Sequence, residues 1–310
     1  MKELLQKTGF RWTAILFCLF LALSIYACGE RQESSKFYYS PTWTRAGTVP
    51  FILGLQTVRK DAIGTELGSS YYESVCTMDA AGAGENFWFD VTGATLSAMS
   101  CSPTTDYLAY LDDLRNGLYG KIVIRNISGT LPHTGLDTID LVFSPGIKSF
   151  DWSNTGTQLV YCTTKEVRVR DWNDFTGATD ALVVAETSLE TVSWQTGTRI
   201  AYVHATAAGK VLSIITPGGA ATDLTVAQSV DKPQISSVNP NMIYGIAGGA
   251  YCVVDVSAPS VPVVILPNFK GDQPRLAPTT ADKVVYSKTA TESSGIYILN
   301  LTTSAETKIK

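Results

Sequence analysis

The sequence has few of the side chains that enzymes commonly use for chemistry. Its 310 residues include 2 histidines, His133 and His204, and neither has a cysteine or carboxylate at metal-ligand spacing beside it. No Gly-x-Ser-x-Gly motif is present, and Gly68-Ser69-Ser70 is interpreted as a turn in a polar loop. Gly82-Ala83-Gly84 is not followed by a helical pattern, which argues against a phosphate-binding loop. The sequence therefore predicts no metal, no cofactor and no catalytic site.

Charge is also scarce, because only 17% of the residues are charged and the formal net charge is −4. No run of basic residues is present, which argues against nucleic acid as a partner. Asp171, Asn173 and Asp174 lack the further oxygen ligands and the glycine spacing of a calcium loop. Long helical patterns are absent after residue 30, and short apolar runs dominate, so we expect an all-β fold.

The first 30 residues have the pattern of an export signal. Basic residues at positions 2, 7 and 11 precede an uncharged stretch at 13–27, which has the length of a signal-peptide core and is short for a transmembrane helix. The stretch ends in Ile25-Tyr26-Ala27-Cys28-Gly29, which resembles the lipobox of bacterial lipoproteins. An uncleaved N-terminal anchor with an incidental Cys28 is the alternative.

The resemblance to lipoproteins implies cleavage between Ala27 and Cys28 and a diacylglycerol on the Cys28 thiol. Residues 1–27 are then the signal peptide and 28–37 a flexible, lipid-anchored tether. We expect a cell-envelope location with the lipid as the contact to the membrane. Gly29 follows the cysteine where an Asp retention signal would stand, so the resemblance favours the outer membrane in a host with two membranes.

A repeat of two apolar residues and a tyrosine recurs along the rest of the chain. The tyrosines are spaced by 51, 41, 42 and 42 residues, and Phe51 provides a weaker first copy. A period of about 40 residues with several strands in each unit is typical of propeller blades. A turn, with tryptophan in the best copies, precedes the repeated tyrosines, which are Tyr110, Tyr161, Tyr202, Tyr244 and Tyr286.

These repeats resemble those of the TolB family and of the prolyl oligopeptidase family, which run roughly Trp-Ser-Pro-Asp-Gly, Ile-Ala-Phe and Ile-Tyr-x-Met-Asp. The resemblance covers about residues 38–310, although no copy keeps the Pro-Asp-Gly turn intact. It implies one propeller of six four-stranded antiparallel blades. It also implies a docking role, because the TolB propeller binds a peptidoglycan-associated lipoprotein.

Aromatic residues at the repeat positions are expected to fill the space between neighbouring blades. Trp43, Trp152 and Trp194 are therefore assigned to the core, together with the repeated tyrosines. No N-terminal strand is left over to complete the last blade, so we expect packing between blades to close the ring. Four buried thiols are expected at the cysteines after Cys28, although a disulfide between Cys76 and Cys101 is an alternative that export permits.

Three functions remain open at this point. The favoured one is an interaction or scaffold module for another envelope protein, whose identity and stoichiometry the sequence does not define. The others are a ligand-binding sensor and a hydrolase or lyase acting at the central pore. Pore enzymes need several converging carboxylates or histidines, and Asp151 is the only carboxylate among the expected inner-strand positions, which are 40–42, 97–99, 149–151, 191–193, 235–237 and 273–275.

The lipid anchor is tested by the substitution Cys28→Ser. We expect this variant to lose metabolic labelling with palmitate and to accumulate as a larger, unprocessed chain or as a soluble form, because the acylated thiol is gone. Lipid labelling at the wild-type level in the variant would contradict the lipoprotein interpretation.

Overall fold

The computed structural model describes residues 31–61, 64–91, 96–113, 120–128, 138–143, 146–174, 176–194, 198–226, 228–259, 261–280, 282–288 and 294–310. Over these ranges the chain forms strands and turns without a helix, and the strands build six four-stranded antiparallel sheets. The predicted six-bladed propeller is confirmed. Nothing in the described ranges forms an apolar helix long enough to cross a membrane.

Each blade is a run of four strands that are consecutive in the sequence, and consecutive strands pair with each other. The first three blades comprise, in order, β1 Arg31–Tyr39, β2 Val49–Lys60, β3 Glu66–Met78 and β4 Asn86–Asp90; β5 Leu96–Cys101, β6 Tyr107–Asp113, β7 Gly120–Asn126 and β8 Thr138–Phe143; and β9 Ser149–Trp152, β10 Gln158–Cys162, β11 Glu166–Asp171 and β12 Ala181–Ala185.

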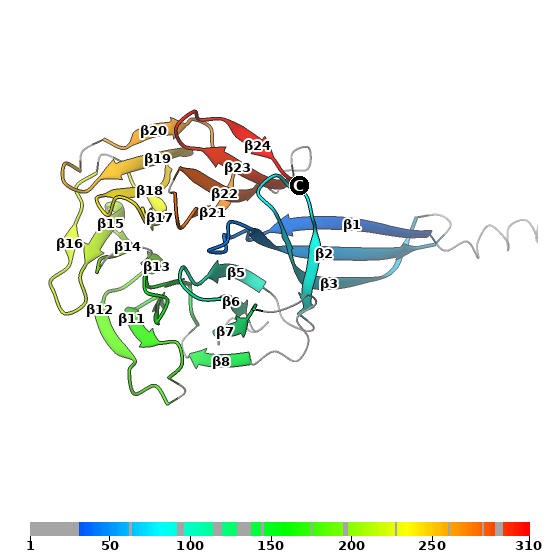
Figure 1. Ribbon diagram of the computed structural model, residues 1–310, viewed down its shortest axis with the longest axis horizontal. Helices are drawn as coiled ribbons and strands as arrows, with labels where there is room; N and C mark the ends of the chain where they lie inside the picture. Colours follow the sequence, from blue (N-terminus) through cyan, green and yellow to red (C-terminus); the bar gives the residue numbers. More distant parts are fainter. Residues whose placement is uncertain are drawn as a thin grey trace, which may run out of the picture. The chain divides into compact units, whose positions relative to one another are not determined.

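The fourth to sixth blades repeat the same order. They comprise β13 Leu189–Ser193, β14 Ile200–Thr206, β15 Gly209–Ile215 and β16 Thr222–Asp223; β17 Asp231–Ile235, β18 Met242–Ala247, β19 Ala250–Asp255 and β20 Val263–Leu266; and β21 Asp272–Leu276, β22 Lys283–Lys288, β23 Gly295–Asn300 and β24 Glu306–Lys308. In blades two to six the first strand lies at the centre of the ring (Figure 1). In blades two to five it lies next to the first strand of the following blade.

Both faces of a blade are buried, and β10 shows how its sequence achieves this. Successive side chains of a strand point to opposite faces. Leu159 and Tyr161 pack in a cluster with the second blade, whereas Val160 and Cys162 pack in a cluster with the fourth. All four are buried, so the sequence of the strand is a continuous apolar run and does not alternate between apolar and polar residues.

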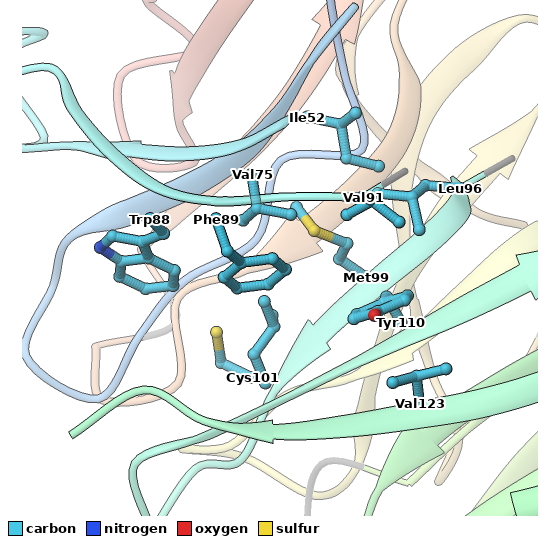
Figure 2. Close-up of a cluster of buried hydrophobic side chains, with 11 residues drawn as sticks. Ile52, Val75, Trp88, Phe89, Val91, Leu96, Met99, Cys101, Tyr110 and Val123 are labelled. Atoms are coloured by element: carbon cyan, nitrogen blue, oxygen red, sulfur yellow. The ribbon is translucent and has the colours of Figure 1, made fainter. Parts of the chain in front are cut away.

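One apolar cluster fills each of the six junctions between blades. In the junction of the first and second blades, the ring of Phe89 lies among side chains from both, including Trp88, Val75 and Tyr110 (Figure 2). Burial of this area is the main source of stability for a fold whose single blades cannot bury their own faces.

The ring closes by packing between the first and sixth blades, as expected. All four strands of the sixth blade come from the C-terminal part of the chain. Trp43 and Phe51 share a cluster with Val285 and Ile298, and Trp43 Nε1 donates to the Arg275 carbonyl at 3.1 Å. Gly82 lies so close to the Ile309 carbonyl that a Cβ atom would be 2.3 Å from the oxygen, so only glycine fits this contact.

The chain divides into two compact units, one of residues 37–53 and 73–310 and the other of residues 1–36 and 54–72. The second unit, as far as the structure describes it, is built from parts of β1, β2 and β3. Within it, Lys60 Nζ and Glu33 Oε2 are 2.6 Å apart. Residues 31–36, assigned above to the flexible tether, are therefore paired strand, and Leu67, Tyr71 and Tyr72 on β3 are exposed.

The tryptophan assignments are confirmed, because Trp43, Trp152 and Trp194 are at most 6% exposed. The tyrosines are buried at four of five positions. Tyr244 is only half-buried, because it packs at the edge of the cluster shared with the sixth blade, whereas the other four tyrosines face the preceding blade. The neighbouring Gly245 approaches Val230 too closely for a Cβ atom. Tyr251 on the neighbouring strand is fully buried instead.

The four described cysteines are buried thiols, so no bond joins Cys76 to Cys101. Burial raises the pKa of Cys162 to about 12 and that of Cys252 to about 11. Both therefore stay protonated at neutral pH and are poor nucleophiles.

Two tryptophans that share a repeat position should differ in stability on substitution. We expect Trp152→Ala to lower the free energy of unfolding by about 3–5 kcal/mol. Trp152 Nε1 donates to the Ser100 carbonyl at 2.9 Å, whereas Trp194 Nε1 has no partner among the described residues. Trp152→Phe should therefore cost about 1 kcal/mol more than Trp194→Phe. Equal costs in urea unfolding would contradict the contribution of this hydrogen bond.

Candidate functional site

Irregular backbone marks the start of several inner strands. β17 and β21 begin with the related sequences Asp231-Lys232-Pro233 and Asp272-Gln273-Pro274, and each shows a register shift against its neighbour there. Lys232 and Gln273 have φ angles of 50° and 48°, in the left-handed region that residues other than glycine rarely adopt. β5 has a register shift between Leu96 and Ala98. Such bulges redirect side chains, here at one end of the central channel.

A cavity of about 290 Å³ lies at this end of the channel. We call it the mouth. The residues that line it come from the second to sixth blades and are Ser97, Ala98, Lys148, Ser149, Thr191, Val192, Lys232, Pro233, Gln234, Asp272, Gln273, Pro274 and Arg275. Its volume is at the lower end of the range for ligand pockets, so it fits a short segment or a small group.

Positive charge exceeds negative charge among the described residues of the mouth. They include the cations Lys148, Lys232 and Arg275 and one carboxylate, Asp272. Lys232 donates to Asp272, which also accepts the Gln273 backbone N–H at 2.9 Å. Lys148 has an exposed side chain and makes no ion pair with any described residue.

Two hydroxyl groups of the mouth are left without partners. Ser97 Oγ and Thr191 Oγ1 are buried from solvent, and neither makes a hydrogen bond within the described part of the chain. Ser97 belongs to the second blade and Thr191 to the fourth, on either side of the third blade, which Lys148 precedes. An unsatisfied buried hydroxyl costs about 1–3 kcal/mol, so native proteins rarely leave two in one cavity.

The floor of the mouth is an ion pair across the channel. Arg275 on β21 lines the mouth, and its Nη1 lies 3.6 Å from Oδ1 of Asp151 on β9. These strands belong to the sixth and third blades, which are opposite each other in a ring of six. Asp151 lines a second cavity of only about 30 Å³, which Arg275 does not line. The pair therefore closes the channel below the mouth.

Asp151 is fully buried and accepts four hydrogen bonds from three blades. Oδ1 accepts from Ser100 Oγ at 3.1 Å and from the Trp152 backbone N–H at 3.0 Å. Oδ2 accepts from Ser193 Oγ and from the Trp194 backbone N–H, each at 3.1 Å. A buried carboxylate is tolerated only when it is compensated in this way. Asp151 is thus a structural group with no free acceptor direction for a substrate.

The inner-strand assignment was right for the second, third, fourth and sixth blades, whereas positions 40–42 follow the end of β1 and the fifth blade was misplaced. There, β17 ends at Ile235, because Ser236 Oγ accepts the backbone N–H groups of Val238 and Asn239 and starts a turn. The conclusion that Asp151 is the only inner-strand carboxylate is wrong as well. Asp231 and Asp272 also lie on inner strands, and Asp272 lines the mouth.

The fourth blade contains a serine–histidine–carboxylate arrangement that the sequence analysis did not find. His204 Nδ1 lies 2.7 Å from Glu186 Oε2, and His204 Nε2 lies 3.3 Å from Ser213 Oγ. Ser213 is 0% exposed, and its hydroxyl donates to Asp223 Oδ1 at 2.6 Å. A nucleophile needs access to its substrate and a proton acceptor in the histidine. These residues therefore act as a polar cluster that joins β14, β15 and β16.

The acidic run at 171–174 folds as a turn. The Asp174 carboxylate accepts the backbone N–H and the hydroxyl of both Thr176 and Thr179, and these donors hold its pKa well below its usual range. Among the described residues, no three His, Cys, Asp or Glu side chains come close enough to hold a metal ion. Ala27, Cys28 and His133 lie outside the described residues.

No family model matches the sequence, and no curated protein matches it. Among solved structures, the putative TolB from Agrobacterium tumefaciens aligns with a TM-score of 0.59 at 16% identity, over 73% of this chain and 84% of that one. A chain of the nidogen/laminin complex aligns with a TM-score of 0.57 at 7% identity, over 89% and 92%. A chain of the COPII outer coat vertex on membranes aligns with a TM-score of 0.58 at 11% identity, over 88% and 75%. At these identities the likeness is one of fold.

The Asp151–Arg275 pair is tested by a double-mutant cycle. Asp151→Ala removes the acceptor of four hydrogen bonds and leaves Arg275 unpaired, so we expect a loss of about 3–5 kcal/mol in the free energy of unfolding. Arg275→Met should cost less, because Asp151 keeps its hydrogen bonds. The double variant should be more stable than the sum of the two losses predicts, by about 1 kcal/mol or more. Additive losses in denaturant unfolding would show that the two side chains do not interact.

Proposed function

We propose that this chain is a lipid-anchored cell-envelope propeller that binds another protein at the mouth and does not turn over a substrate. The observation that carries the proposal is the mouth itself, a blind cavity lined by five blades with unpaired polar groups. It offers hydrogen-bonding groups and charge to a ligand but no nucleophile with a base beside it.

The alternative of a pore enzyme has less support from the site. The Asp151 carboxylate is enclosed by its own donors, and the serine next to His204 is buried. Asp272 Oδ1 already accepts hydrogen bonds from Lys232 and from the Gln273 backbone N–H. Among the solved structures that share the fold, the nidogen/laminin complex and the COPII coat are assemblies of proteins, which supports a binding role.

The envelope location rests on the sequence around Cys28. The apolar stretch at 13–27 and the lipobox-like sequence 25–29 support export followed by lipid attachment. The resemblance of the repeats to those of the TolB family supports a docking role in the same compartment.

Photo-cross-linking in intact cells tests this function. A photoreactive residue replaces Ala98, which lines the mouth, or Thr303, an exposed residue of the turn between β23 and β24, as the matched control. We expect a protein adduct of defined mass from position 98 and none from position 303, because a docked partner covers the mouth. Equal yields from both positions, or no adduct from position 98, would contradict docking at the mouth.

A further inference from the structure

We infer that the mouth recognises a carboxylate of its partner, so that the bound segment is an acidic peptide. This inference rests on the proposed docking function and specifies the chemistry of the ligand. Three features of the mouth support it, namely its unpaired cation, its unpaired hydroxyls and its floor.

Lys148 is the cation without a counterion. Lys232 is paired with Asp272, and Arg275 with Asp151, so their charges are already balanced within the chain. Lys148 has an exposed side chain at the rim, and no described carboxylate pairs with it. Lys148 can therefore attract an incoming anion without the loss of an existing ion pair.

Two unpaired donors accompany this cation. The Ser97 and Thr191 hydroxyls come from the blades on either side of the Lys148 segment, and both are shielded from water. A carboxylate accepts several hydrogen bonds at once, and a hydroxyl with no existing hydrogen bond can turn about its Cα–Cβ bond to donate to one in the mouth. A neutral ligand would satisfy the hydroxyls but leave the charge of Lys148 unbalanced.

Because the floor closes the channel, the mouth can accept a side chain of a bound peptide but not a chain that runs through the channel. The Arg275–Asp151 pair closes the channel below the mouth, and Arg275 lines the bottom of the cavity. Pro233, Pro274 and Val192 provide apolar walls around the polar centre. Apolar walls with a few polar groups are typical of ligand pockets.

Titration of the full chain in detergent with N-acetylated, C-amidated hexaglutamate tests this inference. We expect saturable binding at low ionic strength that weakens as salt is raised, and none with hexaglutamine. Lys148→Gln should weaken binding of hexaglutamate about tenfold, whereas Lys165→Gln, an exposed lysine on the turn between β10 and β11, should change it less than twofold. Inorganic phosphate is titrated in parallel.

Two further variants separate recognition from folding. Ser97→Ala and Thr191→Val should each weaken binding of hexaglutamate while the melting temperature stays unchanged or rises, because a buried hydroxyl without a partner is removed. The inference is overturned if hexaglutamate does not bind, if Lys148→Gln binds it as the wild type does, or if phosphate binds at the mouth more tightly than hexaglutamate.

The cross-linking experiment distinguishes failure of this inference from failure of the proposed function. If position 98 gives an adduct in the wild type and Lys148→Gln abolishes it while Lys165→Gln keeps it, both hold. If the adduct persists at full yield with Lys148→Gln, docking stands and recognition of a carboxylate is wrong. If position 98 gives no adduct in the wild type, docking is wrong, and the hexaglutamate titration still decides the chemistry of the cavity.

Discussion

The buried carboxylate of Asp151 is the group that constrains the propeller most tightly. A charge that is 0% exposed must be compensated inside the protein, and its donors come from the second, third and fourth blades, with Arg275 of the sixth blade opposite. The apolar clusters hold neighbouring blades together but are not directional. The donors around Asp151 fix how the inner strands meet, and the same pair closes the channel and creates a blind mouth.

This closure connects the fold to the proposed activity. One end of the channel is open as a small cavity in a rigid ring. Groups from five blades therefore surround a segment that binds there. The backbone of Lys232 and Gln273 is held in a left-handed conformation at this place, and such strain is found where a site is preorganised. Binding then requires little rearrangement of the protein, so little free energy is lost in ordering the site. This property favours a docking module.

The period of the tyrosine repeat and the aromatic residues at its fixed positions were enough to predict the blades. The tyrosine spacing gave six four-stranded sheets, and the burial of Trp152 and Trp194 followed from their place before the repeated tyrosine. The fifth blade was misplaced because the turn at Ser236 displaces the inner strand toward the N-terminus, which a repeat with a shortened turn does not reveal.

The mouth was not predicted, because the residues that define it, Ser97, Lys148, Thr191 and Lys232, are far apart in the sequence. Register shifts of the strands lie at Ser97, Thr191 and Lys232, and a repeat pattern does not encode such shifts. One signal was present in the sequence, since Asp231-Lys232-Pro233 and Asp272-Gln273-Pro274 occur 41 residues apart in equivalent positions. Proline directly after a bulge residue in two successive repeats marks the same irregular strand start.

Amide hydrogen exchange at Trp152 and Trp194 tests the central claim most directly, because the backbone N–H groups of both residues donate to Asp151. If the buried carboxylate holds the inner strands together, these two amides exchange only through global unfolding and belong to the slowest class in the protein. Exchange at rates close to those of the exposed turn at 302–303 would show that the centre of the ring opens locally, and would contradict this account.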